Sequence, residues 1–225
     1  FIYWVKFLFN LNIDSMKKIL LLGIGVLLFI SCKKEEKIEP TTVETGISGM
    51  FITDSTSTLN WTGSKQTGKH SGTIKIKTGG FTVENGKITD GKFTIDMNSI
   101  SVDDLEGDDK INLEEHLKGT KPDVVDHFFN VVKYPEATFV VTGFMNENGS
   151  DMLEGDLTIK DKTNKVKFAV SLTEADGFVT MSSPEFKIDR TLWGVNYGSK
   201  SIFSDLGDKF INDDIALQIN MKAKK

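Results

Sequence analysis

The stretch FTVENGKITDGKFTIDM, residues 81–97, decides the fold class because it contains both strands of a β-hairpin and the turn between them. Apolar and polar residues alternate on each side of Asn85-Gly86, which is the pattern of strands with one buried face. Asn-Gly accepts the positive φ angles of a type I′ turn. Ile88 has an even number and Phe93 an odd one, so a regular strand would place them on opposite faces. A β-bulge near Asp90-Gly91 is therefore predicted, because it would bring both to the same face.

The same alternation recurs from Thr58 to the end of the chain, with Gly, Asn and Asp between the segments. The further segments lie around residues 59–61, 70–76, 139–141, 153–159, 166–172, 186–188 and 215–221. Short strands with short connections are typical of an all-β sandwich or barrel, here of about eight strands. One short helical insertion is expected, with Asn112 as N-cap, Glu115 in a capping box and Gly119 as its stop. A second helical turn is expected over residues 124–129.

Residues 16–31 have the layout of a secretory signal, with two lysines, an apolar run from Ile19 to Ile30, and Ser31. The run is shorter than the ~20 residues that a membrane-spanning helix needs. Cys32 is the only cysteine, and the residues before it resemble the lipobox of bacterial lipoproteins, whose cysteine is diacylated. We therefore expect an exported lipoprotein that is anchored through Cys32 in the outer membrane and faces the periplasm or the cell surface.

These signals divide the chain into four segments. Residues 1–15 precede the first Met and are interpreted as upstream sequence from a misplaced start, and residues 16–31 form the signal peptide. Residues 32–57, rich in Thr, Ser, Gly and Glu, are interpreted as a tether or linker. Residues 58–225 are long enough to bury one core and form the single folded domain.

The sequence lacks the motifs of common enzyme classes and of nucleic-acid-binding proteins, so no catalytic activity is expected. Acidic residues exceed basic ones by 32 to 27, and no basic patch with interleaved aromatics suggests a nucleic-acid partner. Nucleophile-elbow, phosphate-loop and dinucleotide motifs do not occur, so no cofactor is expected. His116 and His127 lack metal-ligand spacing and are interpreted as surface residues.

Several motifs together resemble the YceI-like family, in the same order along the chain. They are Trp61, Lys69-His70-Ser71-Gly72, Gly80-Phe81, residues 91–97, Phe128-Phe129, residues 133–139, residues 155–159, Asp189-Arg190 and Trp193-Gly194. The resemblance implies a lipocalin-like antiparallel barrel with a long apolar pore. It also implies a small amphiphilic lipid as ligand, such as a polyisoprenoid, an isoprenoid quinone or a fatty-acid amide. His127 stands where the family usually has an acidic residue, and residues 119–126 form a longer segment than usual.

The expected ligand-binding residues are the inward-facing apolar positions together with a few polar ones. They are Trp61, His70, Ile74, Ile76, Phe81, Phe93, Ile95, Met97, Phe128, Phe129, Tyr134, Phe139, Val141, Leu157, Ile159, Phe168, Val170, Phe186, Arg190 and Trp193. A barrel of this size either fills with side chains or holds one small ligand. A packed structural or stress-related envelope scaffold is therefore the alternative function. A third function is an isomerase or hydrolase that acts on a bound lipid through His70 or a buried carboxylate. The assembly could be a homodimer.

Two polar residues in this set have alternative roles. His70 shares the parity of Ile74 and Ile76, so it is either a hydrogen-bonded core histidine or a contact for the ligand head group. Arg190 is the only arginine, and its planar fork suits a carboxylate such as Asp96 or an aromatic face such as Trp193 or Tyr134. A structural clasp at one barrel end and a ligand contact are both consistent with the sequence.

Overall fold

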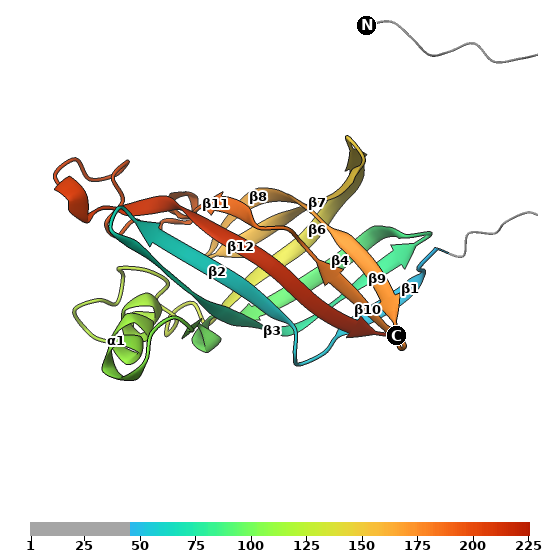
Figure 1. Cartoon of the computed structure of the whole chain (residues 1–225), viewed down its shortest axis with the longest axis horizontal. Coiled ribbons are helices and arrows are strands. Elements are labelled where there is room, and N and C mark those ends of the chain that lie inside the picture. Colours follow the sequence, from blue (N-terminus) through green and yellow to red (C-terminus); the bar gives the residue numbers. More distant parts are fainter. Residues whose placement is uncertain (1–45) are drawn as a thin grey trace, which may run out of the picture. The chain divides into compact units, whose positions relative to one another are not determined.

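The computed structural model describes residues 46–225, which form twelve strands, one α-helix and three 3₁₀ turns (Figure 1). The strands are β1 (Gly49–Thr53), β2 (Thr58–Lys65), β3 (Gly68–Glu84), β4 (Lys87–Asp96), β5 (Ser101–Val102), β6 (Glu136–Glu147), β7 (Ser150–Ile159), β8 (Lys162–Ala169), β9 (Ser171–Ala175), β10 (Phe178–Ser182), β11 (Phe186–Asp189) and β12 (Ile211–Lys224). The helical elements are α1 (Gly107–Lys118), η1 (Met97–Ser99), η2 (Arg190–Trp193) and η3 (Gly207–Lys209).

One antiparallel sheet closes into a barrel. Its order is β8-β7-β6-β4-β3-β1-β12-β10-β9, and β2 fills the gap between β3 and β12. The two ends of this order, β8 and β9, are successive parts of the chain that Val170 joins. Because β8 pairs with β7 and β9 pairs with β10, the sheet returns to itself at this point. The predicted all-β antiparallel barrel is confirmed.

The hairpin at residues 81–97 folds as its sequence predicts. Asn85 and Gly86 have φ angles of 52° and 78°, which are the left-handed values that a type I′ turn requires. The register between β3 and β4 shifts where Thr82 pairs with Asp90 but Val83 pairs with Ile88. The predicted bulge is therefore present, and it brings the side chains on both sides of it to the barrel interior.

The strand count and the start of the domain differ from the prediction. β1 lies inside the segment predicted as linker, and its Phe51 is only 2 % exposed and stacks on Phe81 with ring centroids 5.6 Å apart. The folded domain therefore begins before Thr58. The additional strands are mostly short ones such as β5, whose two residues are too few to show an alternation.

The helical insertion begins earlier than expected. The N-cap of α1 is Glu106, not Asn112, and Asp108 and Asp109 in the first turn favour this start because they face the positive end of the helix dipole. Gly119 ends the helix with a left-handed φ of 68°, as predicted. Residues 124–129 form turns and no continuous helix: His127 N donates to Val124 O three residues back, and Phe129 N donates to Leu117 O in α1.

Three of the expectations concern residues outside the described part of the chain. The upstream segment, the signal peptide and the lipidation of Cys32 all lie before residue 46. Within residues 46–225, no helix has the length and apolar character to cross a membrane.

Candidate functional site

The barrel encloses a cavity of about 350 Å³. The walls come from β2, β3, β4, β6, β7, β8, β10, β11 and β12, and α1 lies across one end of the barrel (Figure 1). Sixteen of the twenty residues predicted to bind ligand line this cavity. They are Trp61, His70, Ile74, Ile76, Phe93, Ile95, Met97, Phe128, Phe129, Phe139, Leu157, Ile159, Phe168, Phe186, Arg190 and Trp193.

The other end of the barrel is packed. Phe81 and Val170 are 2 % and 6 % exposed, but neither lines the cavity. Their neighbours in the core, Phe51 and Val179, are equally buried and also lie away from it. The barrel is therefore filled near β1 and the C-terminal end of β12 and hollow near α1. Parity shows that Phe81 and Val170 face inward, but it does not show which end of the barrel they reach.

Tyr134 and Val141 also lie outside the cavity. Tyr134 sits in the loop before β6, where the Lys133 ammonium lies 5.0 Å from the centre of its ring. Val141 faces inward but is partly exposed beside Gly91, next to a register shift in the β6–β7 pairing. The alternation therefore gives the correct face for both Phe139 and Val141, but only Phe139 lines the cavity.

Part of the cavity wall was missed by the prediction. Strand β12 contributes Ile215, Leu217, Ile219 and Met221, and α1 contributes Leu113, His116 and Leu117; others are Leu59, Leu153, Val166, Met181, Ile188, Val195 and Ile211. The strong alternation of β12 could have identified its four residues. Nothing in the local sequence of α1 could have placed it over the cavity, because that depends on the fold of the whole barrel.

Two glycines allow close contacts in the wall. A Cβ atom at Gly155 would lie 2.2 Å from the ring of Phe139, so only glycine lets this ring lie flat against β7. A Cβ atom at Gly72 would lie 1.8 Å from the carbonyl oxygen of Ser101, so glycine also lets β5 cross β3 beside Trp61. Both aromatic rings face the cavity as a result.

Both tryptophans on the inner wall have their polar atom bonded to the protein. Trp61 Nε1 donates to the carbonyl of Ser101 at 3.2 Å, and Trp193 Nε1 donates to the carbonyl of Leu157 at 2.9 Å. Each indole therefore offers the cavity only its apolar ring.

Arg190 is a structural clasp at the cavity wall. Its side chain is 2 % exposed, and its guanidinium donates to the carbonyls of Val195, Ile211 and Asn212 at 2.5, 3.2 and 3.1 Å. These bonds tie the loop after η2 to the start of β12. Burial lowers the pKa of Arg190, and the nearby carboxylates of Asp213 and Asp189 oppose this effect.

The partners of Arg190 are not those named from the sequence. Its nearest carboxylate is Asp213, 3.7 Å away, and the ring closest to its charge is Phe128 at 5.9 Å. Asp96 instead accepts a hydrogen bond from the backbone N–H of Asn98 and begins η1. Burial raises the pKa of Asp213, but hydrogen bonds from Ser199 and Ser201 and the charge of Arg190 outweigh this, so its pKa lies below the ordinary value.

His70 lies at the rim of the cavity. Its Nδ1 is 3.0 Å from Oδ2 of Asp104, and the other oxygen of Asp104 accepts the backbone N–H of Ser71. With its side chain 37 % exposed, His70 is not a core histidine, although it lines the cavity. Other polar residues at this rim are Ser64, Lys65, Lys69 and Asn212.

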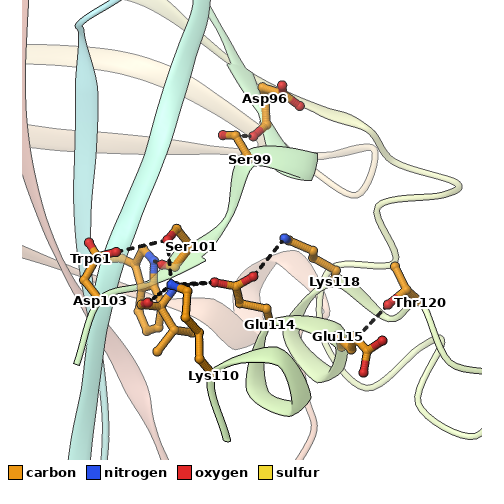
Figure 2. A network of polar contacts seen from close by, with 11 residues as sticks. Trp61, Asp96, Ser99, Ser101, Asp103, Lys110, Glu114, Glu115, Lys118 and Thr120 are labelled. Carbon is orange, nitrogen blue, oxygen red and sulfur yellow. Dashed lines mark hydrogen bonds and ion pairs between the residues drawn. The ribbon is translucent and has the colours of Figure 1, made fainter. Parts of the chain in front are cut away.

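Helix α1 is held against the barrel by Glu114 (Figure 2). Glu114 Oε1 accepts the backbone N–H of Val102 at 3.0 Å and pairs with Lys110 at 2.9 Å, while Oε2 lies 3.5 Å from Lys118. Lys110 also donates to the hydroxyl of Ser101 and to the carbonyl of Val102. Burial raises the pKa of Glu114, but these bonds and charges outweigh it and lower the pKa overall.

His116 and His127 were expected at the surface, but the structure brings them together at the mouth of the cavity. His116 Nε2 and His127 Nδ1 are 2.8 Å apart, which is a hydrogen-bond distance. The ring of Tyr197 stacks on His127 with centroids 4.0 Å apart. His116 itself lines the cavity. The described residues contain no group of three or more side chains that could hold a metal ion.

Comparison with solved structures identifies the same fold. BcnA from Burkholderia cenocepacia superposes with a TM-score of 0.59 at 21% identity, covering 76% of this chain and 100% of that one. A polyisoprenoid binding domain from Saccharophagus degradans, implicated in plant cell wall breakdown, has a TM-score of 0.52 at 12% identity and covers 79% of this chain and 99% of that one. At these identities the similarity establishes the fold alone.

Sequence comparison gives the family. A UPF0312 protein of Shewanella denitrificans is 30% identical over 89 residues, which span 39% of this chain and 41% of that protein. The model of the YceI-like domain matches residues 51–223, a range that contains the cavity-lining residues. The chain therefore belongs to the YceI-like family.

Proposed function

We propose that this protein binds or carries an amphiphilic lipid without chemically changing it. The apolar chain of the lipid would occupy the cavity, and its head group would lie at the rim. The cavity carries this proposal, because its volume of about 350 Å³ lies within the range of about 300–1,000 Å³ that is usual for small-molecule sites. A fully packed scaffold would have filled this space with side chains.

The distribution of polar groups supports a ligand with one polar end. The inner wall carries aromatic and aliphatic side chains, and the polar atoms of Trp61, Trp193 and Arg190 are already bonded to backbone carbonyls. Binding would therefore come from apolar burial, worth about 25 cal/mol per Å², with little directional chemistry inside the barrel. The rim offers exposed ammonium groups and the half-exposed His70 to a head group.

The ligand class is proposed from family membership. The Saccharophagus domain is described as polyisoprenoid-binding, and a polyisoprenoid, an isoprenoid quinone or a fatty-acid amide would each suit a cavity lined by phenylalanine rings. We also propose that the chain is exported and anchored through acylated Cys32, because the residues before it resemble a lipobox. Two or more acyl chains would give a stable anchor.

A matched pair of substitutions tests the cavity. Val166 lines the hollow part of the barrel, whereas Val179 is buried in the packed part. Val166→Phe should fill space that is now free, so it should weaken binding of the apolar dye Nile red about tenfold or more, or about 1.4 kcal/mol. It should change the free energy of unfolding by less than about 1 kcal/mol. Val179→Phe should instead cost about 1–3 kcal/mol of stability through overpacking.

Dye fluorescence titration and urea unfolding of both variants measure these effects. If Val166→Phe binds the dye as well as the unchanged protein, the cavity is not the binding site. If both variants lose similar stability, the barrel is packed throughout, and the scaffold function would then be favoured.

A further inference from the structure

Helix α1 is attached to the barrel on two sides by contacts of different chemistry. On one side Glu114 and Lys110, which form an ion pair with each other, bind β5 through hydrogen bonds (Figure 2). On the other side His116 contacts His127, from the loop after α1, and Tyr197, from the loop after η2. Leu113, His116 and Leu117 line the cavity, so the position of α1 determines how open the cavity is on this side. Backbone hydrogen bonds from Phe129 and Val131 to the carbonyls of Leu117 and Lys118 also join the end of α1 to the loop that follows it.

The second attachment is a compact cluster of rings. His116 and His127 have centroids 5.0 Å apart, and the ring of Tyr197 lies 4.9 Å from His116 and 4.0 Å from His127. Phe128 packs edge-on against His116 at 5.2 Å. The only polar contact between the two imidazoles is the 2.8 Å bond from ring nitrogen to ring nitrogen. We call these four residues the latch.

That bond depends on protonation. An N–H···N bond needs one imidazole nitrogen that is unprotonated and can accept. When both rings are protonated, two N–H donors face each other at 2.8 Å, and the two positive charges repel. The bond therefore survives the first proton and is lost with the second.

We propose that the latch is sensitive to acid. Through His116 and His127 it holds α1 over the cavity near neutral pH and releases it in mild acid.

The charged surroundings of the pair favour this behaviour. Burial lowers the pKa of His116, the charge of His127 lowers it further, and the Asp123 carboxylate acts in the opposite direction. The other charged groups nearby have partners of their own. Glu115 pairs with Lys121 at 2.6 Å, and Lys118 pairs with Glu114 at 3.5 Å. Asp126 accepts from the Asn130 amide at 2.8 Å, and Arg190 donates to three backbone carbonyls.

The sign of the effect follows from linkage. A histidine with a lowered pKa in the closed form binds fewer protons there than in the open form, where its pKa is near the ordinary value of about 6.5. The closed form is therefore fully stable above about pH 6.5 and loses stability as the pH falls below it, by up to about tenfold per pH unit. The other attachment stays intact in this range, because the pKa of Glu114 lies below its ordinary value of 4.5.

Hydrogen exchange of the backbone amides of α1 in the full-length chain tests the latch without any ligand. Expressed as protection factors, the α1 amides should lose about tenfold protection between about pH 7.5 and 5.5, while amides of β7 keep theirs. His127→Asn should weaken this pH dependence, because the uncharged amide can turn its oxygen toward protonated His116, so that only the effect of burial on His116 remains. His127→Asp should reverse it, because protonated His116 would pair with the carboxylate.

His70→Asn is the matched control, since it removes the third histidine, which lies at the rim and outside the latch. It should leave the pH dependence of α1 unchanged. Unchanged α1 protection between the two pH values in the unmodified chain would overturn the proposal. An acid response of undiminished size in His127→Asn would overturn it as well.

The consequence for ligand release rests on the proposed function. Dissociation of Nile red should accelerate in acid by the same factor as α1 opening, and His127→Asn should reduce the acceleration. If α1 opens in acid but the dye never binds, the latch stands and the proposed function fails. If the dye binds but its release is the same at both pH values, the latch does not control the cavity.

Discussion

At the scale of single residues, Arg190 shows how a charged group can lie in an apolar wall. Each of its three guanidinium nitrogens donates one hydrogen bond to a backbone carbonyl. A lysine could not replace it, because a single ammonium cannot reach three carbonyls in the plane of a fork. This explains why a chain with 26 lysines uses one arginine here.

We expect Arg190→Lys to lower the free energy of unfolding by about 2–4 kcal/mol, since buried carbonyls would lose their donors. Affinity for an apolar dye should stay within about twofold, because the lost bonds go to the protein. Urea unfolding and dye titration measure the two quantities. The control is Lys187→Arg, at an exposed position of β11, which should change the free energy of unfolding by less than about 0.5 kcal/mol. Lost affinity with unchanged stability would make Arg190 a ligand contact instead.

Some residue roles could not be read from the sequence. The fork of Arg190 predicted a clasp, but its partners are backbone carbonyls, which carry no sequence signal. His116 and His127 are eleven residues apart and belong to different elements, so only the folded chain places them 2.8 Å from each other. The inward parity of Phe139 and Phe168 was sufficient to place both in the cavity wall.

At the scale of elements, α1 owes its position to a few polar contacts more than to apolar packing. Among its residues only Leu117 is buried, with Leu113 partly covered above the cavity. Glu114 and Lys110 make the polar contacts with β5, and Glu114 also pairs with Lys110. Elements held in this way open locally at a lower cost than the sheet beneath them.

Glu114→Gln should therefore loosen α1 without unfolding the barrel. Loss of the charge that faces Lys110 and Lys118 should lower the free energy of local opening by about 1–2 kcal/mol, seen as faster hydrogen exchange of α1 amides. Glu115→Gln, which removes a carboxylate that pairs with Lys121, is the matched control. Equal effects of the two substitutions would show that Glu114 is not the anchor.

The pH dependence of this anchor has a definite sign. Because the pKa of Glu114 is lowered in the closed form, its contribution is complete above the ordinary value of 4.5 and is lost as the pH falls through the lowered value. The unmodified protein should therefore show a second loosening of α1 below about pH 4.5, which Glu114→Gln lacks. This step is separate from the histidine step near pH 6.5.

Secondary structure was predictable where the pattern is periodic. Long alternating strands and Asn-Gly turns appear where expected, with Asn148-Gly149 as a second turn of positive φ angles. β1 was missed because it carries only one buried residue, Phe51, between exposed Met50 and Ile52. The start of α1 was missed because Glu106 makes no side-chain cap bond, whereas Asn112 had the residue type of a cap.

At the scale of the whole molecule, the barrel is packed at one end and hollow at the other. Phe51, Phe81 and Phe93 form a continuous run of ring contacts that leads from the packed end into the cavity wall. Sequence could not distinguish a hollow barrel from a packed one, because both need the same inward-facing apolar residues. The difference depends on barrel width and on how far each ring reaches, which only the closed sheet determines.

The central claim is that the hollow end holds a lipid. The most direct measurement is native mass spectrometry of the purified chain from a bacterial host, followed by organic extraction of any bound compound. We predict a bound mass that extracts as a single-chain prenyl or acyl amphiphile and that is absent from Val166→Phe. A ligand-free mass, even after incubation with isoprenoid quinones and fatty-acid amides, would contradict the account and favour a structural role for the barrel.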